Sequence, residues 1–160
     1  MKYNTALLEA DIRDELEKLT TLSREYETIR KLFPCSAQEI SFFDKAATGY
    51  FLHSFYNGCE NIFRLIARFF ENDIGSDSWH RDLLKRMKLE IPGYRPPLID
   101  NETFQLFDEL RAFRHVFRHC YSFQLDWARE KILAEKFPLV WKRFEEQVNN
   151  FLLSLRKSDL

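Results

Sequence analysis

Residues 114–121 are the part of this sequence best suited to chemistry, because they combine cationic and proton-carrying side chains in a short span. The segment reads Arg-His-Val-Phe-Arg-His-Cys-Tyr. Cleaving RNA without a metal requires a group that moves protons at the 2'-hydroxyl or the leaving oxygen, and a fixed cation that holds the charge developing on phosphate. Histidine carries protons near neutral pH, and arginine grips phosphate oxygens with its planar fork. His119 and Arg114 are therefore the candidate catalytic residues for such a reaction.

Further cations lie beside this pair. Arg111, Arg114, His115, Arg118 and His119 fall within nine residues that contain no acidic residue, although the net charge of the whole chain is -1. Arg111 and Arg118 are suited to guiding and binding an RNA polyanion. Arginines at such spacings also form ordinary solvated helix faces. Both interpretations stay open, above all for Arg111.

His80 marks a second place where RNA contact is predicted. It stands in Trp79-His80-Arg81, and an aromatic ring beside two cationic groups suits base stacking and phosphate contact. An ordinary helix start explains the same residues more simply. His53 lies among aromatic residues of a helix and is assigned to packing.

A metal site is the main chemical alternative for the two histidines of the motif. His115 and His119 stand four residues apart on one helical face, a spacing that also suits zinc. No cysteine or carboxylate has a convincing spacing to complete the ligand set, so neither a metal nor a cofactor is predicted. Taken alone, His119 could be a core histidine bonded to the backbone. Its neighbours Arg114, His115 and Tyr121 favour catalysis or RNA contact.

One regular helix cannot bring the two candidate catalytic residues together. Five residues of an ideal helix rotate the chain by about 140°, so Arg114 and His119 do not share a face. They can converge only near a helix end or across a dimer. The motif does lie at the predicted C-terminal end of a helix, just before Ser122.

Hydrophobic periodicity predicts the helices that position this motif. The first begins near Leu8 and stops near Pro34, since the residue before a proline is pushed out of helical geometry. A capping box of Ser36 and Glu39 then starts a second helix over residues 37–71. This second helix is apolar around much of its circumference, which predicts a central position.

Two glycines lie inside that long central helix. A glycine in a helix interior costs about 1 kcal/mol relative to alanine. Gly49 and Gly58 therefore mark either a kink or a close helix contact.

The remaining pattern completes an all-helical chain. It comprises a short helix over residues 78–87, a loop over 91–97, a helix capped by Asp100 or Asn101 and reaching about Tyr121, and a last helix over 127–155 that Pro138 should bend or restart. Five helical segments with short connections predict an all-α fold, a four-helix bundle with an additional short helix. We expect residues 1–160 to form a single domain.

Cysteine usage and hydropathy indicate the cellular compartment in which the protein works. The three cysteines are odd in number and widely spaced, which argues against a disulfide framework and favours a reducing cytoplasm. No stretch approaches the roughly 18 uninterrupted apolar residues of a membrane span. We therefore expect a cytoplasmic protein without a membrane segment.

The motif resembles the signature of HEPN-domain ribonucleases. Arg114, the polar His115, three further residues and His119 reproduce the pattern Arg-[Asn/Asp/His]-x3-His. Continuing to Tyr121 gives Arg-x4-His-x-Tyr, which is similar to the version carried by HepT-like toxins. The resemblance covers roughly residues 39–155 and implies a HEPN-type four-helix bundle.

The resemblance implies a metal-independent endoribonuclease that is the toxin of a toxin-antitoxin pair and cleaves cellular RNA, either tRNA or mRNA. It also implies a homodimer in which the Arg and His of two subunits meet in one cleft. Arg114 and His119 would be the catalytic pair, with His115 assisting. Glu60 and Asn61, on the preceding long helix, would line the cleft.

A partner and a modification follow from the same resemblance. HepT-like toxins pair with a minimal nucleotidyltransferase antitoxin that attaches AMP to the motif tyrosine, here Tyr121, and so adds charge and bulk beside the cleft. The alternative function is a non-catalytic HEPN module that binds a nucleotidyltransferase, although such modules usually lack the complete motif. A bundle that only mediates assembly leaves the basic cluster unexplained.

Overall fold

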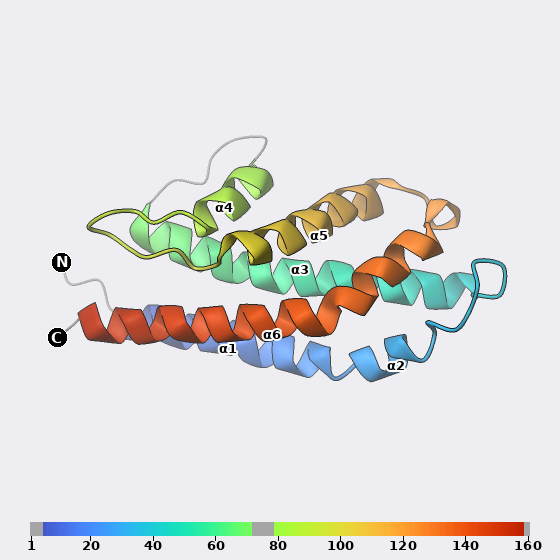
Figure 1. The fold of residues 1–160 in the computed structure, drawn as a ribbon, viewed down its shortest axis with the longest axis horizontal. Helices are drawn as coiled ribbons and strands as arrows, with labels where there is room; N and C mark the ends of the chain where they lie inside the picture. Colours follow the sequence, from blue (N-terminus) through green and yellow to red (C-terminus); the bar gives the residue numbers. More distant parts are fainter. Residues whose placement is uncertain (1–4, 72–78, 159–160) are drawn as a thin grey trace.

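Four long helices run along one another in the computed structural model, which describes residues 5–71 and 79–158 (Figure 1). They are α1 (Thr5–Ser23), α3 (Phe42–Phe70), α5 (Asn101–His119) and α6 (Trp127–Ser158), and the shorter elements are α2 (Tyr26–Arg30), α4 (Trp79–Met87) and the 3-10 turn η1 (Ser122–Gln124). Within the described ranges the only strand-like pairing is one isolated bridge between Ile91 and Arg95. The predicted all-α bundle with an additional short helix is confirmed.

The first helix ends earlier than predicted. Instead of running to the neighbourhood of Pro34, α1 stops at Ser23 and α2 forms a separate short helix. The hydroxyl of Thr20 donates to the carbonyl of Leu16 at 2.9 Å, and that of Ser23 donates to the carbonyl of Thr20 at 2.6 Å. Hydroxyls that bond back to the preceding turn compete with regular continuation of a helix, which explains the early end.

The second helix also begins later than predicted, and the start at Ala37 is wrong. The hydroxyl of Ser36 does accept from the backbone N–H of Glu39 at 3.3 Å, but this bond closes only a separate turn. The cap of α3 is Ser41, whose hydroxyl accepts from the backbone N–H of Asp44 at 3.0 Å. A similar cap a few residues downstream therefore takes the place of the predicted one.

The central position predicted for α3 is confirmed, since this helix packs against α1, α4, α5 and α6. The ring of Phe107 on α5 lies 6.1 Å from Phe55 and 5.6 Å from Phe63 of α3, and 5.2 Å from Phe144 of α6, between ring centroids. These aromatic contacts join three helices into one core. In the part of the chain that the structure describes, no helix combines the length and the apolar character needed to cross a bilayer.

The two helical glycines are sites of close helix contact. A Cβ atom added at Gly58 would lie 2.5 Å from Cδ2 of Leu19 in α1, and one added at Gly49 would lie 2.7 Å from Cε2 of Phe117 in α5. The missing side chains thus let neighbouring helices approach α3. The contact at Gly49 fixes the C-terminal end of α5, which carries the motif.

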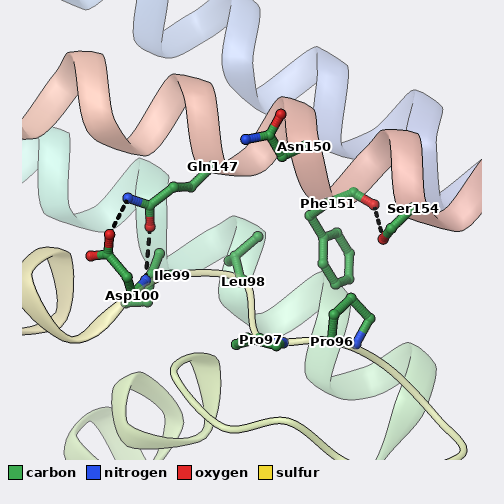
Figure 2. A pocket seen from close by; sticks show the side chains of 9 residues that line it. All are labelled: Pro96, Pro97, Leu98, Ile99, Asp100, Gln147, Asn150, Phe151 and Ser154. Carbon is green, nitrogen blue, oxygen red and sulfur yellow. Dashed lines mark hydrogen bonds between the residues drawn. The ribbon is translucent and has the colours of Figure 1, made fainter.

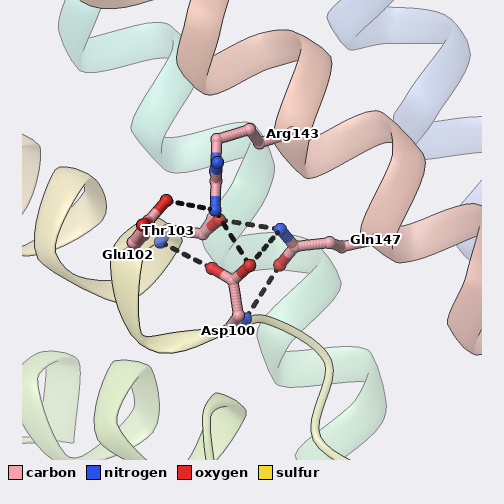
Figure 3. A network of polar contacts seen from close by, with 5 residues as sticks. All are labelled: Asp100, Glu102, Thr103, Arg143 and Gln147. Carbon is pink, nitrogen blue, oxygen red and sulfur yellow. Dashed lines mark hydrogen bonds and ion pairs between the residues drawn. The ribbon is translucent and has the colours of Figure 1, made fainter.

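The N-terminal end of α5 is fixed by polar contacts with α6. Asp100, one of the two predicted caps, accepts from the backbone N–H of Thr103 at 2.8 Å. Gln147 accepts from the backbone N–H of Asp100 at 2.9 Å beside a pocket of about 300 Å³ (Figure 2). Arg143 donates to Asp100 at 2.9 Å and to Thr103 at 3.1 Å (Figure 3). Both ends of the motif-bearing helix are therefore held by its neighbours.

The C-terminal end of α5 differs from the prediction, whereas the bend of α6 agrees with it. α5 stops at His119, short of the predicted Tyr121, because Cys120 adopts an extended backbone with φ -97° and ψ 153°. α6 continues through Pro138. Figure 1 shows α6 bending in its N-terminal half, which contains this proline, as predicted.

A buried arginine, which the sequence patterns did not single out, holds the loop between α4 and α5. Arg95 donates to the carboxylate of Glu71 at 3.0 Å and to the carbonyls of Leu89 and Arg86 at 3.1 Å each. The turn before it needs Gly93, whose φ of 80° lies in the left-handed region. The loop is irregular, as predicted, yet its position relative to α3 is specified.

Candidate active site

Arg114 is the residue of the motif that faces the bundle. Its side chain is half-buried, and Nε donates to Oδ1 of Asn57 on α3 at 2.8 Å. Burial lowers the pKa of the Arg114 guanidinium, and the nearby carboxylate of Glu60 opposes this shift. Arginine keeps its charge under such conditions. The contact thus holds one permanent cation in a defined orientation at the edge of the core.

Asn57 connects Arg114 to His53. Because arginine can only donate, the atom of Asn57 that faces it is the amide oxygen, and the amide nitrogen lies 3.0 Å from Nε2 of His53. Nε2 must therefore accept, which leaves the ring proton on Nδ1. Burial, followed by the charges of Arg114 and Arg118, lowers the pKa of His53, in agreement with a neutral ring. The ring also packs on Phe117 at 5.4 Å between centroids, as predicted.

His119 and His115 lie on a different side of α5 from Arg114. Both are exposed, and their ring centroids are 4.9 Å apart. Among the described residues, no hydrogen bond or ring contact joins Arg114 to His119. A single chain thus holds the proposed cation and the proposed proton carrier on separate faces, as expected from the rotation of about 140° between them.

Glu60 and His80, which the sequence proposed separately, meet in the structure. The Glu60 side chain is almost completely buried, and its Oε2 lies 2.7 Å from Nδ1 of His80 on α4. Arg64 donates to the other carboxylate oxygen at 3.2 Å, and its guanidinium lies 4.4 Å from the ring centre of Trp79. A buried carboxylate with two cationic or proton-carrying partners is well satisfied. The pair also attaches α4 to α3 next to the motif-bearing helix.

Asn61 points away from this group. Its amide nitrogen donates to the carboxylate of Glu15 on α1 at 3.4 Å. The amide that meets Arg114 belongs to Asn57 instead. Helix α3 therefore supplies a carboxylate, from Glu60, and an amide on the side that faces α4 and α5. The amide comes from Asn57 and not from Asn61, the residue that the family resemblance implied.

Asn57 and Arg64, which sequence reasoning missed, belong to a polar stripe along α3. His53, Asn57, Glu60 and Arg64 recur at spacings of four, three and four, which places them on one helical face. In a helix that is otherwise rich in phenylalanine, this spacing was an available signal. It indicates a polar face directed at α4 and α5 rather than isolated packing residues.

The two flanking arginines differ in how their charge is compensated. Arg111 forms an ion pair with Asp108 at 2.8 Å within α5. Arg118 is exposed and, in the described part of the chain, forms no ion pair. Of the two arginines predicted to bind RNA, Arg118 is the more available to a polyanion.

Tyr121 lies beyond the end of α5 and extends into solvent. Its side chain is 71% exposed, and its ring stacks on that of Phe123. The backbone N–H of Tyr121 donates to Oε1 of Gln124 at 2.7 Å. Most of the Tyr121 side chain is thus open to solvent.

The pocket of Figure 2 is separate from this group of residues. It is lined by Pro96, Pro97, Leu98, Ile99, Asp100, Gln147, Asn150, Phe151 and Ser154, none of which was predicted to belong to the site. No set of three or more His, Cys, Asp or Glu side chains within residues 5–71 and 79–158 is arranged to hold a metal ion.

Comparison with known proteins identifies the family to which this chain belongs. A family model described as HepT-like protein matches residues 47–155, a span that includes all of α4, α5 and the motif. No match was found among curated proteins or among solved structures. Because the matched span covers more than half of the chain, this chain belongs to the family of HepT-like proteins.

Proposed function

We propose that this chain is a metal-independent endoribonuclease, the toxin of a HEPN/nucleotidyltransferase toxin-antitoxin pair that cleaves tRNA or mRNA in the cytoplasm. HepT-like proteins are generally HEPN ribonuclease toxins. One observation carries the proposal. A member of this family presents the complete set of Arg114, His119 and Tyr121 at one helix end, with the arginine oriented by α3 and the histidine exposed.

In the proposed reaction the 2'-oxygen of RNA forms a bond to the adjacent phosphorus while the bond from phosphorus to the 5'-oxygen breaks. The products are a 2',3'-cyclic phosphate and a 5'-hydroxyl. His119 moves the proton at one of these two oxygens and solvent completes the transfer at the other. Arg114 stabilises the charge that develops on the non-bridging oxygens, and His115, beside His119, assists.

The separation of the two catalytic residues supports a composite site. Arg114 faces α3 while His119 faces solvent, so Arg114 of one chain pairs with His119 of a second chain. A closed twofold homodimer contains two such sites by symmetry. The end of α5 would then lie at the interface.

Substrate binding is assigned to cations around this end of the bundle. The exposed Arg118 contacts phosphate, whereas Arg111, already paired with Asp108, contributes less. His80 contacts RNA from α4 through the ring nitrogen that does not face Glu60.

The supporting residues of α3 act by orienting others. Glu60 holds His80, and Asn57 holds Arg114. The contacts favour Asn57 over Asn61 for the amide role, since Asn61 donates to Glu15.

Cleavage of total RNA in excess EDTA tests the proposal. We expect purified, unmodified protein to cut RNA into fragments that end in 2',3'-cyclic phosphate, because the proposed groups need no metal. Activity that appears only when a divalent metal is added would contradict the mechanism. Protein that is folded and dimeric but inert with and without metal would contradict the enzyme itself and favour a module that binds a nucleotidyltransferase.

We further propose that the partner nucleotidyltransferase switches the enzyme off at Tyr121. The phenolic oxygen attacks the α-phosphorus of ATP, pyrophosphate leaves, and the phenolic proton is lost to solvent. Intact mass after incubation with ATP and the partner should show an AMP adduct on wild type and not on Tyr121→Phe. Tyr94→Phe is the matched control, because Tyr94 is 68% exposed. Equal adducts on wild type and Tyr121→Phe would exclude Tyr121 as the only site.

A further inference from the structure

The 3-10 turn after the motif presents two aromatic rings to solvent. Tyr121 and Phe123 are 71% and 75% exposed. Their ring centroids are 5.5 Å apart and their planes differ by only 4°. An exposed phenylalanine gains little from burial in the folded chain. The stacked pair therefore forms an exposed aromatic group, two to four residues after His119 in the sequence, that the core of the protein does not use.

The turn that carries these rings is closed by two local hydrogen bonds. The backbone N–H of Tyr121 donates to the side chain of Gln124 at 2.7 Å, and the backbone N–H of Gln124 donates to the carbonyl of Tyr121 at 2.8 Å. Leu125, which follows, is buried in the protein. Because these two bonds join the ends of the turn to each other, the two rings belong to a defined local structure.

The charged side chains that precede the aromatic pair in the sequence are cationic, and the first acidic residue after it is Asp126. Residues 114–125 contain two arginines and two histidines and no acidic residue. Arg118 and His119, both exposed, end α5 and lie within four residues of the turn. Aromatic faces beside cations are the combination that binds single-stranded RNA, since bases stack on the rings while phosphates contact the cations. A purely apolar partner surface would leave the charge of Arg118 unmatched.

From this arrangement we infer that Tyr121 and Phe123 form a base-stacking subsite, which holds an unpaired nucleobase of RNA and directs the adjoining phosphate toward Arg118 and His119. The inference rests on the proposed function and adds to it a substrate class, unpaired rather than duplex RNA. Phe123 is the residue specific to the subsite, because it has no part in the proposed proton transfer or modification.

Binding of a single-stranded oligoribonucleotide in which every 2'-hydroxyl is replaced by fluorine tests the subsite. Such an RNA analogue lacks the attacking oxygen and cannot be cleaved, so affinity is measured apart from activity. We expect Phe123→Leu to weaken binding by about 5- to 150-fold, the range found when a base loses its aromatic partner. Phe123→Trp should retain tight binding. Tyr94→Leu is the matched control, because Figure 1 shows its loop at the other end of α5.

The outcomes separate the subsite from the proposed enzyme. Equal affinity of wild type and Phe123→Leu, with matching circular dichroism spectra, would overturn the subsite even if wild type cleaves RNA. Binding that depends on Phe123 in a protein that never cleaves RNA would keep the subsite and reject the ribonuclease. If Phe123→Leu dissociates dimers and leaves the affinity per chain unchanged, the rings belong to a subunit interface. Equal affinity for duplex and single-stranded analogues would also contradict the inference.

Discussion

Replacement of His119 by alanine should lower the rate of RNA cleavage by about 10²- to 10⁴-fold, the usual contribution of a positioned proton-transfer group. The side chain is exposed at the end of α5, so its removal creates no core cavity and helical content should be unchanged. His115→Ala is the matched control on the same face, where the ring centroids are 4.9 Å apart. It should cause a smaller loss, since His115 only assists.

Single-turnover cleavage of a defined RNA in EDTA gives the rates, and circular dichroism verifies the fold. A variant that retains the fold and cleaves as fast as wild type would remove His119 from the mechanism. Equal losses for His119→Ala and His115→Ala would instead indicate that the two histidines act as one unit.

Mixed dimers test whether the site is built from two chains. Arg114→Lys should be inactive, because lysine cannot reproduce the planar fork of arginine. Mixing it with inactive His119→Ala should restore roughly a quarter of wild-type activity, because half of randomly paired dimers are mixed and each keeps one intact site. A mixture that stays inactive after subunit exchange would show that the two residues act within one chain.

The second large effect concerns stability rather than activity. Raising the pH from 5 to 8 should reduce the free energy of unfolding by about 3 kcal/mol through one buried carboxyl, that of Glu130. Glu130 is fully buried, and both carboxylate oxygens lack a hydrogen-bond partner. Its Oε1 would lie only 2.9 Å from a Cβ added at Gly49. Burial raises the pKa of Glu130 from 4.5 to about 8.

The direction of this pH effect on stability follows from proton binding to Glu130. Between the two pKa values the folded chain holds a proton on Glu130 that the unfolded chain has lost, so rising pH favours unfolding. The stabilising proton is fully retained below pH 4.5 and is lost through pH 8. Above that pH the folded chain contains an unpaired buried charge, which is strongly unfavourable.

Urea denaturation at several pH values measures this effect. Glu130→Gln removes the titration, so its free energy of unfolding should vary less between pH 5 and 8 and exceed that of wild type at pH 8. Glu135→Gln, which changes an exposed residue of the same helix, should follow wild type. Parallel pH profiles for wild type and Glu130→Gln would show that Glu130 does not titrate as described.

Local patterns in the sequence determined most of the helical content. Apolar spacings of three and four indicated the long helices, since this periodicity involves only residues within a few turns. The same local rules named Asp100 as one of two candidate caps, and they left Gly58 open between a kink and a close contact, which its packing on Leu19 decided. The end of α1 and the start of α3 did not follow from these rules, because hydroxyls such as those of Thr20 and Ser36 offer competing local bonds. Packing of the helices against one another selects which of these local hydrogen bonds ends or begins a helix.

The motif was likewise a property of the sequence. Arg114, His119 and Tyr121 are identified by type and spacing, and the geometry of a helix already separates the first two by about 140°. Their catalytic and modification roles remain predictions. The stripe of polar residues on α3 was also present in the sequence, without any indication of what it would meet.

Only the tertiary structure decided the partners of these residues. Asn57 meets Arg114 across 57 positions of sequence, and His80 meets Glu60 across 20. Whether Asn57 or Asn61 faces α5 depends on the rotation of α3 about its own axis. That rotation is set by core packing between helices far apart in the chain. The sequence by itself therefore determined which groups are available for chemistry, whereas helix packing determined which of them stand together.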